Sequence, residues 1–321
     1  ENLKRKGKIQ VLAIGVNQYK NSDYNLYYAV KDAVDLGTEL RQQQTKLNNF
    51  DTPEVLQLTD KEATKSNILY ALEKFSKGDQ ASKPTEISSE IEKKFSNIEK
   101  LQPEDVLVVY FAGHGTAFKE RFYLIPTDGF PIESDNEKSR IEQIQKQSIS
   151  DLELEAVFRD LDAGQILLVI DACNSGQALE AEEKRRGPMN SRGLAQLAYE
   201  KGMFILTAAQ SYQAALEVAV TPSGKQIEHG LLTYSLLEGV NGLKADENED
   251  DEISEREWFG FAVREVPKLQ VEEMKKRNAE VKKGEKKTDG TRKIEVFFVE
   301  GDSEENPDNR GLQTPRVFYK R

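Results

Sequence analysis

The sequence predicts an α/β protein built on a mostly parallel sheet with helices on both faces. Two observations carry this prediction. Short, nearly continuous apolar segments recur along the 321 residues, and the segments between them place apolar residues at helical spacing. Continuous apolar strands are typical of parallel sheets buried on both faces, and strands that alternate with helices are typical of doubly wound folds. Because the apolar segments resume after each charged segment, we expect one domain over residues 1–321.

The first half of the chain opens with a compact apolar run, Lys8–Gly15, which predicts a buried strand. Short apolar runs and segments with apolar residues at helical spacing then alternate. The elements expected in this half are a helix over 26–40, a strand over 54–58, a helix over 64–75, a weak helical pattern within 79–102, a strand over 105–111 and an extended piece over 121–125.

The second half opens with a helix expected over 150–161, with Ser150 or Asp151 as its N-cap. Val317 and Phe318 stand in a terminal tail, which we expect to dock along the body of the protein. The remaining elements expected here are strands over 165–171, 202–207 and 294–299, and helices over 231–240 and 254–266.

Charge and residue usage exclude several classes of protein. The chain has 45 basic and 56 acidic residues, a net charge of −11, which argues against nucleic-acid binding. The longest apolar run, Val106–Ala112, is far shorter than the ~18 residues that span a bilayer, so we expect no membrane association. A single cysteine, Cys173, permits no internal disulfide and suits a reducing, cytoplasmic location.

Two predicted strands end in residues suited to nucleophilic catalysis. The strand over 105–111 runs into His114 in the motif FAGHG, and the strand over 165–171 runs into Cys173 in DACNSG. If these strands are neighbours, the two residues share one rim of the sheet, where an imidazole can serve a thiolate as base and acid. The N–H groups of Gly115 and Cys173 could then bind an oxyanion. A buried structural cysteine and a structural histidine are the alternative.

These motifs, in this order and 59 residues apart, resemble those of the caspase-like cysteine peptidases, above all the bacterial homologues (orthocaspases) and the metacaspases. The segments VLAIGVNQY, FYLIPTD and EHGLLTYSLLEGV extend the resemblance along the chain. It implies a caspase-like three-layer sandwich around a six-stranded, mostly parallel sheet. It also implies a large-subunit-like part over about 1–180, a linker over about 181–193 and a small-subunit-like part over about 194–321.

The same resemblance implies a function. Cys173 would be the nucleophile and His114 the general base and acid in peptide-bond hydrolysis through an acyl-enzyme, with no cofactor needed for the chemistry. His229 matches a non-catalytic position and would have a structural or capping role. Self-processing is common in such enzymes, and Arg185, Arg186 and Arg192 in the linker are the candidate sites, unless the linker is an ordinary charged loop.

Specificity is expected to come from two carboxylates. Asp171 stands two residues before Cys173, and Asp32 matches an acidic pocket position of metacaspases. Two carboxylates in one cleft would bind a guanidinium or ammonium group, so we expect cleavage after Arg and, second, after Lys. Ala112 replaces a serine common in metacaspases, which leaves the preference between Arg and Lys open. The alternatives are that Asp171 binds backbone N–H groups and that Asp32 is exposed or caps its helix.

An acidic segment, 246–257, has the oxygen spacing of an EF-hand calcium loop. Its sixth position, usually glycine, is Asp251, which would strain the turn. The alternative is a solvated acidic turn that caps the following helix. The candidate Ca²⁺ ligands are Asp246, Asn248, Asp250, Ser254 and Glu257.

Two other functions remain open from the sequence: a catalytically silent scaffold or adaptor with the same fold, and a cysteine-dependent transpeptidase. The expected partners are proteins or peptides with Arg or Lys before the scissile bond. Because the sequence begins with Glu1 rather than Met, we also expect an upstream sensor or regulatory domain or protein.

Overall fold

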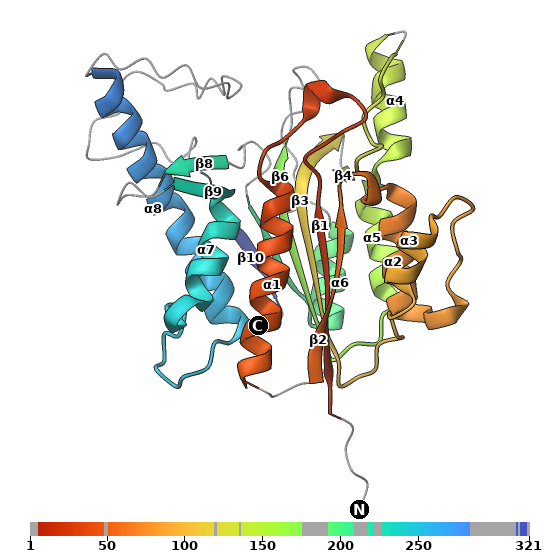
Figure 1. Ribbon diagram of the computed structural model, residues 1–321, viewed down its shortest axis with the longest axis horizontal. Helices are drawn as coiled ribbons and strands as arrows, with labels where there is room; N and C mark the ends of the chain where they lie inside the picture. Colours follow the sequence, from red (N-terminus) through yellow and green to blue (C-terminus); the bar gives the residue numbers. More distant parts are fainter. Residues whose placement is uncertain are drawn as a thin grey trace, which may run out of the picture.

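A central sheet with helices on both faces forms the body of the protein (Figure 1). The computed structural model describes residues 6–47, 51–118, 121–134, 136–174, 192–208, 217–220, 226–282, 313 and 315–319. Within these ranges the main sheet has the strand order β10-β7-β6-β3-β1-β2. Its strands are β1 (Lys8–Gly15), β2 (Asp51–Thr59), β3 (Val106–Phe118), β6 (Gln165–Asn174), β7 (Phe204–Thr207) and β10 (Arg316–Phe318).

Neighbouring strands of this order run parallel, except that β10 is antiparallel to β7. Two short strands extend the sheet: β4 (Arg121–Ile125) pairs antiparallel with the end of β3, and β5 (Ile149–Ser150) pairs with β4. The prediction of a mostly parallel sheet covered by helices is therefore confirmed.

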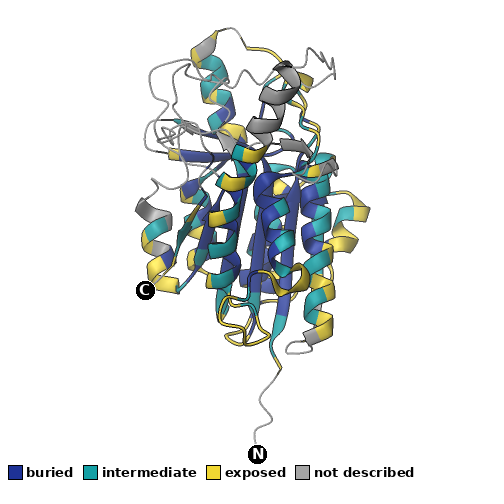
Figure 2. Ribbon diagram, turned by 90° about the vertical axis from the view of Figure 1, so that its left-hand side faces the viewer, coloured by how far each residue is buried: buried dark blue, intermediate teal, exposed yellow. Residues whose placement is uncertain are grey.

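Helices cover the two faces of the sheet separately. One face carries α1 (Ala29–Leu47), α7 (Leu231–Val240) and α8 (Glu255–Lys282), and the other carries α2 (Lys65–Lys77), α3 (Ser89–Phe95), α5 (Asp151–Arg159) and α6 (Arg192–Lys201) (Figure 1). Alternate residues of β1 divide between two apolar cores, with Val11 on the α1 side and Leu12 on the α2 side. Figure 2 shows the buried strands between helices whose outer faces are exposed.

Local signals in the sequence set several helix starts. Thr64 caps α2 by accepting a hydrogen bond from the Asn67 N–H. Ser150 caps α5 as expected: its hydroxyl accepts from the Glu153 N–H, and the Glu153 carboxylate accepts from the Ser150 N–H at 2.9 Å. Short 3-10 turns lie at Ser22–Tyr24, Asp60–Glu62, Gly78–Gln80 and Asn241–Leu243.

Several elements differ from their prediction. The strand β3 continues to Phe118, past the expected end at Phe111, because β4 pairs with its last residues. The helix α8 continues to Lys282 through Pro267, well past the expected end at residue 266. The helices α4 (Glu137–Gln147) and α6, and the hairpin of β8 (Glu217–Val220) and β9 (Gln226–Gly230), were not predicted.

The far edge of the sheet is formed by the tail. The strand expected over 294–299 lies outside the described residues. The docking of the tail is confirmed, since Val317 pairs with Leu206 and Phe318 with Ile205 as β10 lies along β7. Val317 packs on the core beneath α1, and Phe318 packs on the core of the opposite face.

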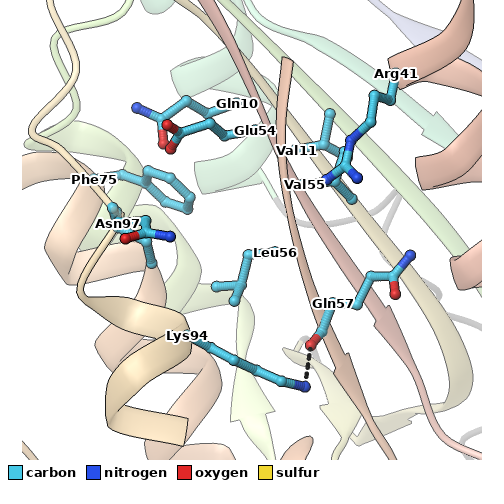
Figure 3. Close-up of a pocket in the computed structure, with 11 residues that line it drawn as sticks. Gln10, Val11, Arg41, Glu54, Val55, Leu56, Gln57, Phe75, Lys94 and Asn97 are labelled. Atoms are coloured by element: carbon cyan, nitrogen blue, oxygen red, sulfur yellow. Dashed lines mark hydrogen bonds between the residues drawn. The ribbon is translucent and has the colours of Figure 1, made fainter. Parts of the chain in front are cut away.

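A hollow of about 360 Å³ lies along the outer edge of β2 (Figure 3). Gln10, Glu54 and Val55 line it from the strands, and Lys94 reaches across to donate a hydrogen bond to the Gln57 carbonyl. It is level with the first residues of β1. None of the helices in the described part of the chain is long and apolar enough to cross a membrane.

Candidate active site

The two catalytic candidates occupy one row of the sheet. The parallel register of β3 and β6 pairs His114 with Cys173, and the next row pairs Gly115 with Asn174. Neighbouring strands lie about 4.8 Å apart, so the backbones of His114 and Cys173 are in direct proximity. The expectation that these two strands are neighbours is confirmed.

The location of the two motifs needs a correction. Both were expected in loops beyond the strands, but His114 lies inside β3 and Cys173 inside β6. The reason is the hairpin with β4, which pairs His114 with Ile125 and so keeps the chain extended beyond residue 111. The sequence does not indicate this pairing, because the apolar pattern of β4 is short and does not show which strand β4 lies beside.

His114 is held in a defined tautomer. Its Nε2 lies 2.8 Å from the carbonyl oxygen of Tyr24, and its side chain is almost entirely buried. Because a carbonyl only accepts hydrogen bonds, Nε2 carries a proton. In the neutral ring, Nδ1 is then the basic nitrogen. The Tyr24 carbonyl thus does for His114 what an acidic residue does in other catalytic triads: it orients the imidazole.

An aromatic cage surrounds the imidazole. The rings of Tyr19, Phe130 and Tyr24 lie 5.1, 5.6 and 6.3 Å from that of His114, centroid to centroid. The Tyr19 hydroxyl also accepts a hydrogen bond of 2.8 Å from the His114 backbone N–H. Sequence reasoning missed these residues. The one available signal was the concentration of tyrosines after the first strand, in a loop that the topology brings to the carboxyl ends of the strands.

Two buried carboxylates, Asp32 and Asp171, converge near this row. Asp171 ends the apolar part of β6, and one of its oxygens accepts from the Thr233 hydroxyl at 2.8 Å and lies 3.4 Å from the Tyr110 hydroxyl. Asp32, in the first turn of α1, accepts from Nδ1 of His229 at 2.7 Å and from the Gly230 N–H at 3.1 Å.

Gly230 separates the two carboxylates. A Cβ atom on Gly230 would lie 3.1 Å from Oδ2 of Asp171 and 3.2 Å from Oδ2 of Asp32. The two acidic oxygens therefore face one point from different elements. The alternative that Asp32 is exposed is excluded, because only 3% of its surface is accessible.

Burial and mutual repulsion disfavour charge on this pair. Burial raises the pKa of Asp171 to about 7, and the negative charge of Asp32 contributes to the rise. Burial also raises the pKa of Asp32, although the hydrogen bonds from His229 and Gly230 oppose the change. Among the described residues no lysine or arginine forms an ion pair with Asp171.

The acidic loop after α7 closes on itself. Asp246 accepts hydrogen bonds from the backbone N–H groups of Asp250 and Asp251, and Asp251 has a φ of 65°, the left-handed conformation that glycine usually supplies at this position. The Glu257 carboxylate accepts from the N–H and hydroxyl of Ser254, and the expected helix-capping contact is thus present. These contacts lower the pKa of Glu257.

The oxygens of this loop are thus occupied by its own backbone. Among the described residues, no group of three or more His, Cys, Asp or Glu side chains is placed to hold a metal ion. Calcium binding by Asp246, Asn248, Asp250, Ser254 and Glu257 stays a prediction, and no step of the mechanism below passes through it. Of the candidate self-cleavage sites, Arg185 and Arg186 lie outside the described residues, and Arg192 is the first residue of α6.

Comparisons with known proteins place the chain in a family. No curated protein matches it significantly. Among solved structures it is similar to a protein of Geobacter sulfurreducens, with 16% identity, a TM-score of 0.48 and coverage of 82% of this chain and 90% of that one. The family model described as a caspase domain of peptidases matches residues 10–255, a span that includes His114 and Cys173. The chain therefore belongs to the caspase family of cysteine peptidases.

Proposed function

We propose that the protein is an endopeptidase of the metacaspase type that cleaves after Arg and, second, after Lys, with Asp32 and Asp171 binding the basic side chain. The observation that carries the proposal is that these two buried carboxylates converge on one point beside Gly230. Asp171 stands on β6, two residues before Cys173. Family membership supports peptide hydrolysis in general, and the carboxylates supply the specificity.

The catalytic step follows from the His114 tautomer. With Nε2 donating to the Tyr24 carbonyl, Nδ1 is the atom that accepts the thiol proton of Cys173. The thiolate attacks the scissile carbonyl, and the N–H groups of Gly115 and Cys173 are the proposed oxyanion donors. The leaving amine takes the proton from His114. Water, deprotonated by the same imidazole, then hydrolyses the thioester.

Electrostatics favours a cationic substrate. Two carboxylates that face each other in a buried site repel, and the repulsion is part of what raises the pKa of Asp171. A guanidinium placed between them restores both charges and satisfies both oxygens. Arg has five donors in a planar fork, whereas Lys offers a single point charge, so Arg is the preferred residue before the scissile bond.

Self-processing follows from the same specificity. Arg185 and Arg186 lie between β6 and α6, and Arg192 is the first residue of α6. An enzyme that cleaves after Arg would accept these residues if they reached the active site. Calcium responsiveness is proposed on the spacing of the acidic loop alone.

Fluorogenic peptides that end in Arg, Lys or Asp test the proposal, each with calcium and with a chelator. We expect release from Arg above Lys, none from Asp, and none from a Cys173→Ala variant. The wild type alone should also be cut in the linker, at a bond that mass spectrometry identifies. Release from Asp peptides only would contradict the assignment of Asp32 and Asp171. Ligated products with an added amine would indicate a transpeptidase, and silence in every assay would favour the scaffold.

A further inference from the structure

We propose that His229 is a positioning residue for substrate specificity, which acts by fixing Asp32 in the acidic pocket proposed to bind the basic side chain. The inference rests on the proposed function and goes beyond it, because His229 contacts neither His114 nor any reacting atom in the described structure. Its place in the chain is the end of β9, directly before Gly230, which is the N-cap of α7.

Two consecutive residues bind the same carboxylate. His229 donates from Nδ1 to Oδ1 of Asp32 at 2.7 Å, and the Gly230 N–H lies 3.1 Å from Oδ2 and 3.3 Å from Oδ1. A carboxylate only accepts, so Nδ1 carries the proton. Oδ1 of Asp32 is thereby engaged by the imidazole. Oδ2 is left directed toward Gly230, where Asp171 also arrives.

The imidazole is itself held on both sides. Its Nε2 lies 3.3 Å from Oδ2 of Asp35, one turn further along α1, and Asp35 is in turn paired with Lys31. Only 13% of the His229 side chain is exposed. An imidazole fixed in this way is suited to orienting another side chain, since its own rotation would break contacts at both nitrogens.

Loss of the imidazole should therefore weaken substrate binding rather than the chemical step. A buried carboxylate that loses a strong donor takes up a proton or turns away, and either change removes a negative charge from the pocket. Cys173 and His114 form the pair two residues along β6 and β3 from the pair of Asp171 and Ala112, and His114 keeps its hydrogen bond to the Tyr24 carbonyl. The expected signature is a higher KM for basic substrates at nearly constant kcat.

Three substitutions of His229 separate the effect of losing the hydrogen bond to Asp32 from the effect of losing side-chain volume. The amide nitrogen of His229→Asn falls near the position of Nδ1, that of His229→Gln falls near Nε2, and His229→Ala offers no donor. We expect the Ala and Gln variants to raise KM for an Arg peptide about ten- to a hundredfold, as loss of a hydrogen bond to a charged group does. The Asn variant should stay within about fivefold of wild type, because it keeps the bond to Asp32.

Two further measurements test the role of His229 without relying on peptide cleavage. Binding of agmatine, a free guanidinium ligand, is measured by calorimetry in the Cys173→Ala background, with the same order expected: wild type and Asn tight, Gln and Ala weak. Alkylation of Cys173 by iodoacetamide should be equally fast in all His229 variants, and their melting temperatures show that they fold. If His229→Ala does not fold, the comparison of the His229→Asn and His229→Gln variants still tests the inference.

The outcomes distinguish this inference from the proposed function. Cleavage after Arg by the wild type, with KM and agmatine affinity unchanged in the Gln and Ala variants, would overturn the inference alone. A wild type that prefers an uncharged or acidic residue, or that neither cleaves Arg peptides nor binds agmatine, would overturn both. A rise in KM matched by an equal fall in kcat and slower alkylation would also overturn it, since the role would then be general folding.

Discussion

Asp171 is a buried carboxyl group that forms no ion pair with a lysine or arginine among the described residues, and the proposed function gives this carboxyl group the role of binding a basic side chain. Groups that bind a charged ligand are often held in a site that disfavours their own charge, and perturbed pKa values accordingly gather at functional positions. Under the proposed function, the positive charge of the substrate would relieve this destabilisation. Asp32 is the better stabilised member of the pair, because His229 and Gly230 donate to it.

The pH dependence of KM tests this account. Burial raises the pKa of Asp171 to about 7, so the carboxyl is mostly neutral a unit below that pH and mostly charged a unit above it. Only the charged form attracts a guanidinium. KM for an Arg peptide should therefore fall about tenfold between pH 6 and pH 8 in steady-state assays.

The control for this prediction is Asp171→Asn, which cannot ionise. Its KM should be high and independent of pH over the same interval, while kcat keeps the pH dependence set by His114 and Cys173. A wild-type KM that does not change with pH would show that Asp171 does not bind the substrate.

Gly230 offers a second test at the residue scale. Its backbone, with φ of −63° and ψ of 149°, is open to any residue, so Gly230→Ala adds a methyl group without backbone strain. That methyl group would lie within 3.2 Å of both carboxylate oxygens and would displace them. We expect KM for Arg peptides to rise about tenfold or more, as overpacking costs of this kind imply.

A matched control is Gly260→Ala, where the added methyl group would meet only the flexible end of Arg264. That variant should have wild-type kinetics. If Gly230→Ala also has wild-type kinetics, the space beside Gly230 is not where the basic side chain binds.

At the scale of elements, helix caps could be predicted from the sequence, whereas the pairing of strands could not. The start of α5 could be predicted because Ser150 and Glu153 form its capping box within four residues. The length of β3 could not, since it depends on β4. The pairing of His114 with Cys173 was predictable only on the condition that the two strands were neighbours. The contacts of His229 with Asp32 join residues 197 positions apart, and no periodicity in the sequence indicates them.

The strand β10 makes a testable contribution to stability. Phe318 is partly buried against the core on the α2 side of the sheet. Phe318→Ala should therefore lower the free energy of unfolding by about 1–2 kcal/mol, measured by urea denaturation. Arg316→Ala, on the exposed end of the same strand, should change it by less than about 0.5 kcal/mol. Equal effects would mean that β10 contributes only its backbone pairing.

At the scale of the whole molecule, the proposed pocket joins parts from both sides of the linker. Asp32 comes from α1 and Asp171 from β6, both before residue 175, whereas His229, Gly230 and Thr233 come after residue 191. The sequence could supply the candidates Asp32 and Asp171 from the family resemblance. It could not supply their partners, because these depend on how α7 packs against α1.

A cut in the linker should therefore leave the molecule assembled. The strand β6 pairs with β7 across the cut, and α1 remains in contact with α7. We expect the two fragments of a nicked Cys173→Ala protein, cut at an engineered protease site in place of residues 185–187, to elute together in size-exclusion chromatography and to separate only in denaturant. Separation under native conditions would show that the linker itself holds the halves together.

The antiparallel edge of the sheet also sets an order of events during synthesis. The ribosome completes β7 long before β10, since the chain from Ala208 to Pro315 is made between them. During that interval β10 is not yet present to pair with the outer edge of β7, and an open edge pairs readily with strands of other chains. A nascent or refolding molecule is therefore most prone to self-association just before its tail arrives. The arrival of Val317 and Phe318 pairs that edge, and the outermost described strand is then β10, which has only three residues and so offers little edge for further pairing.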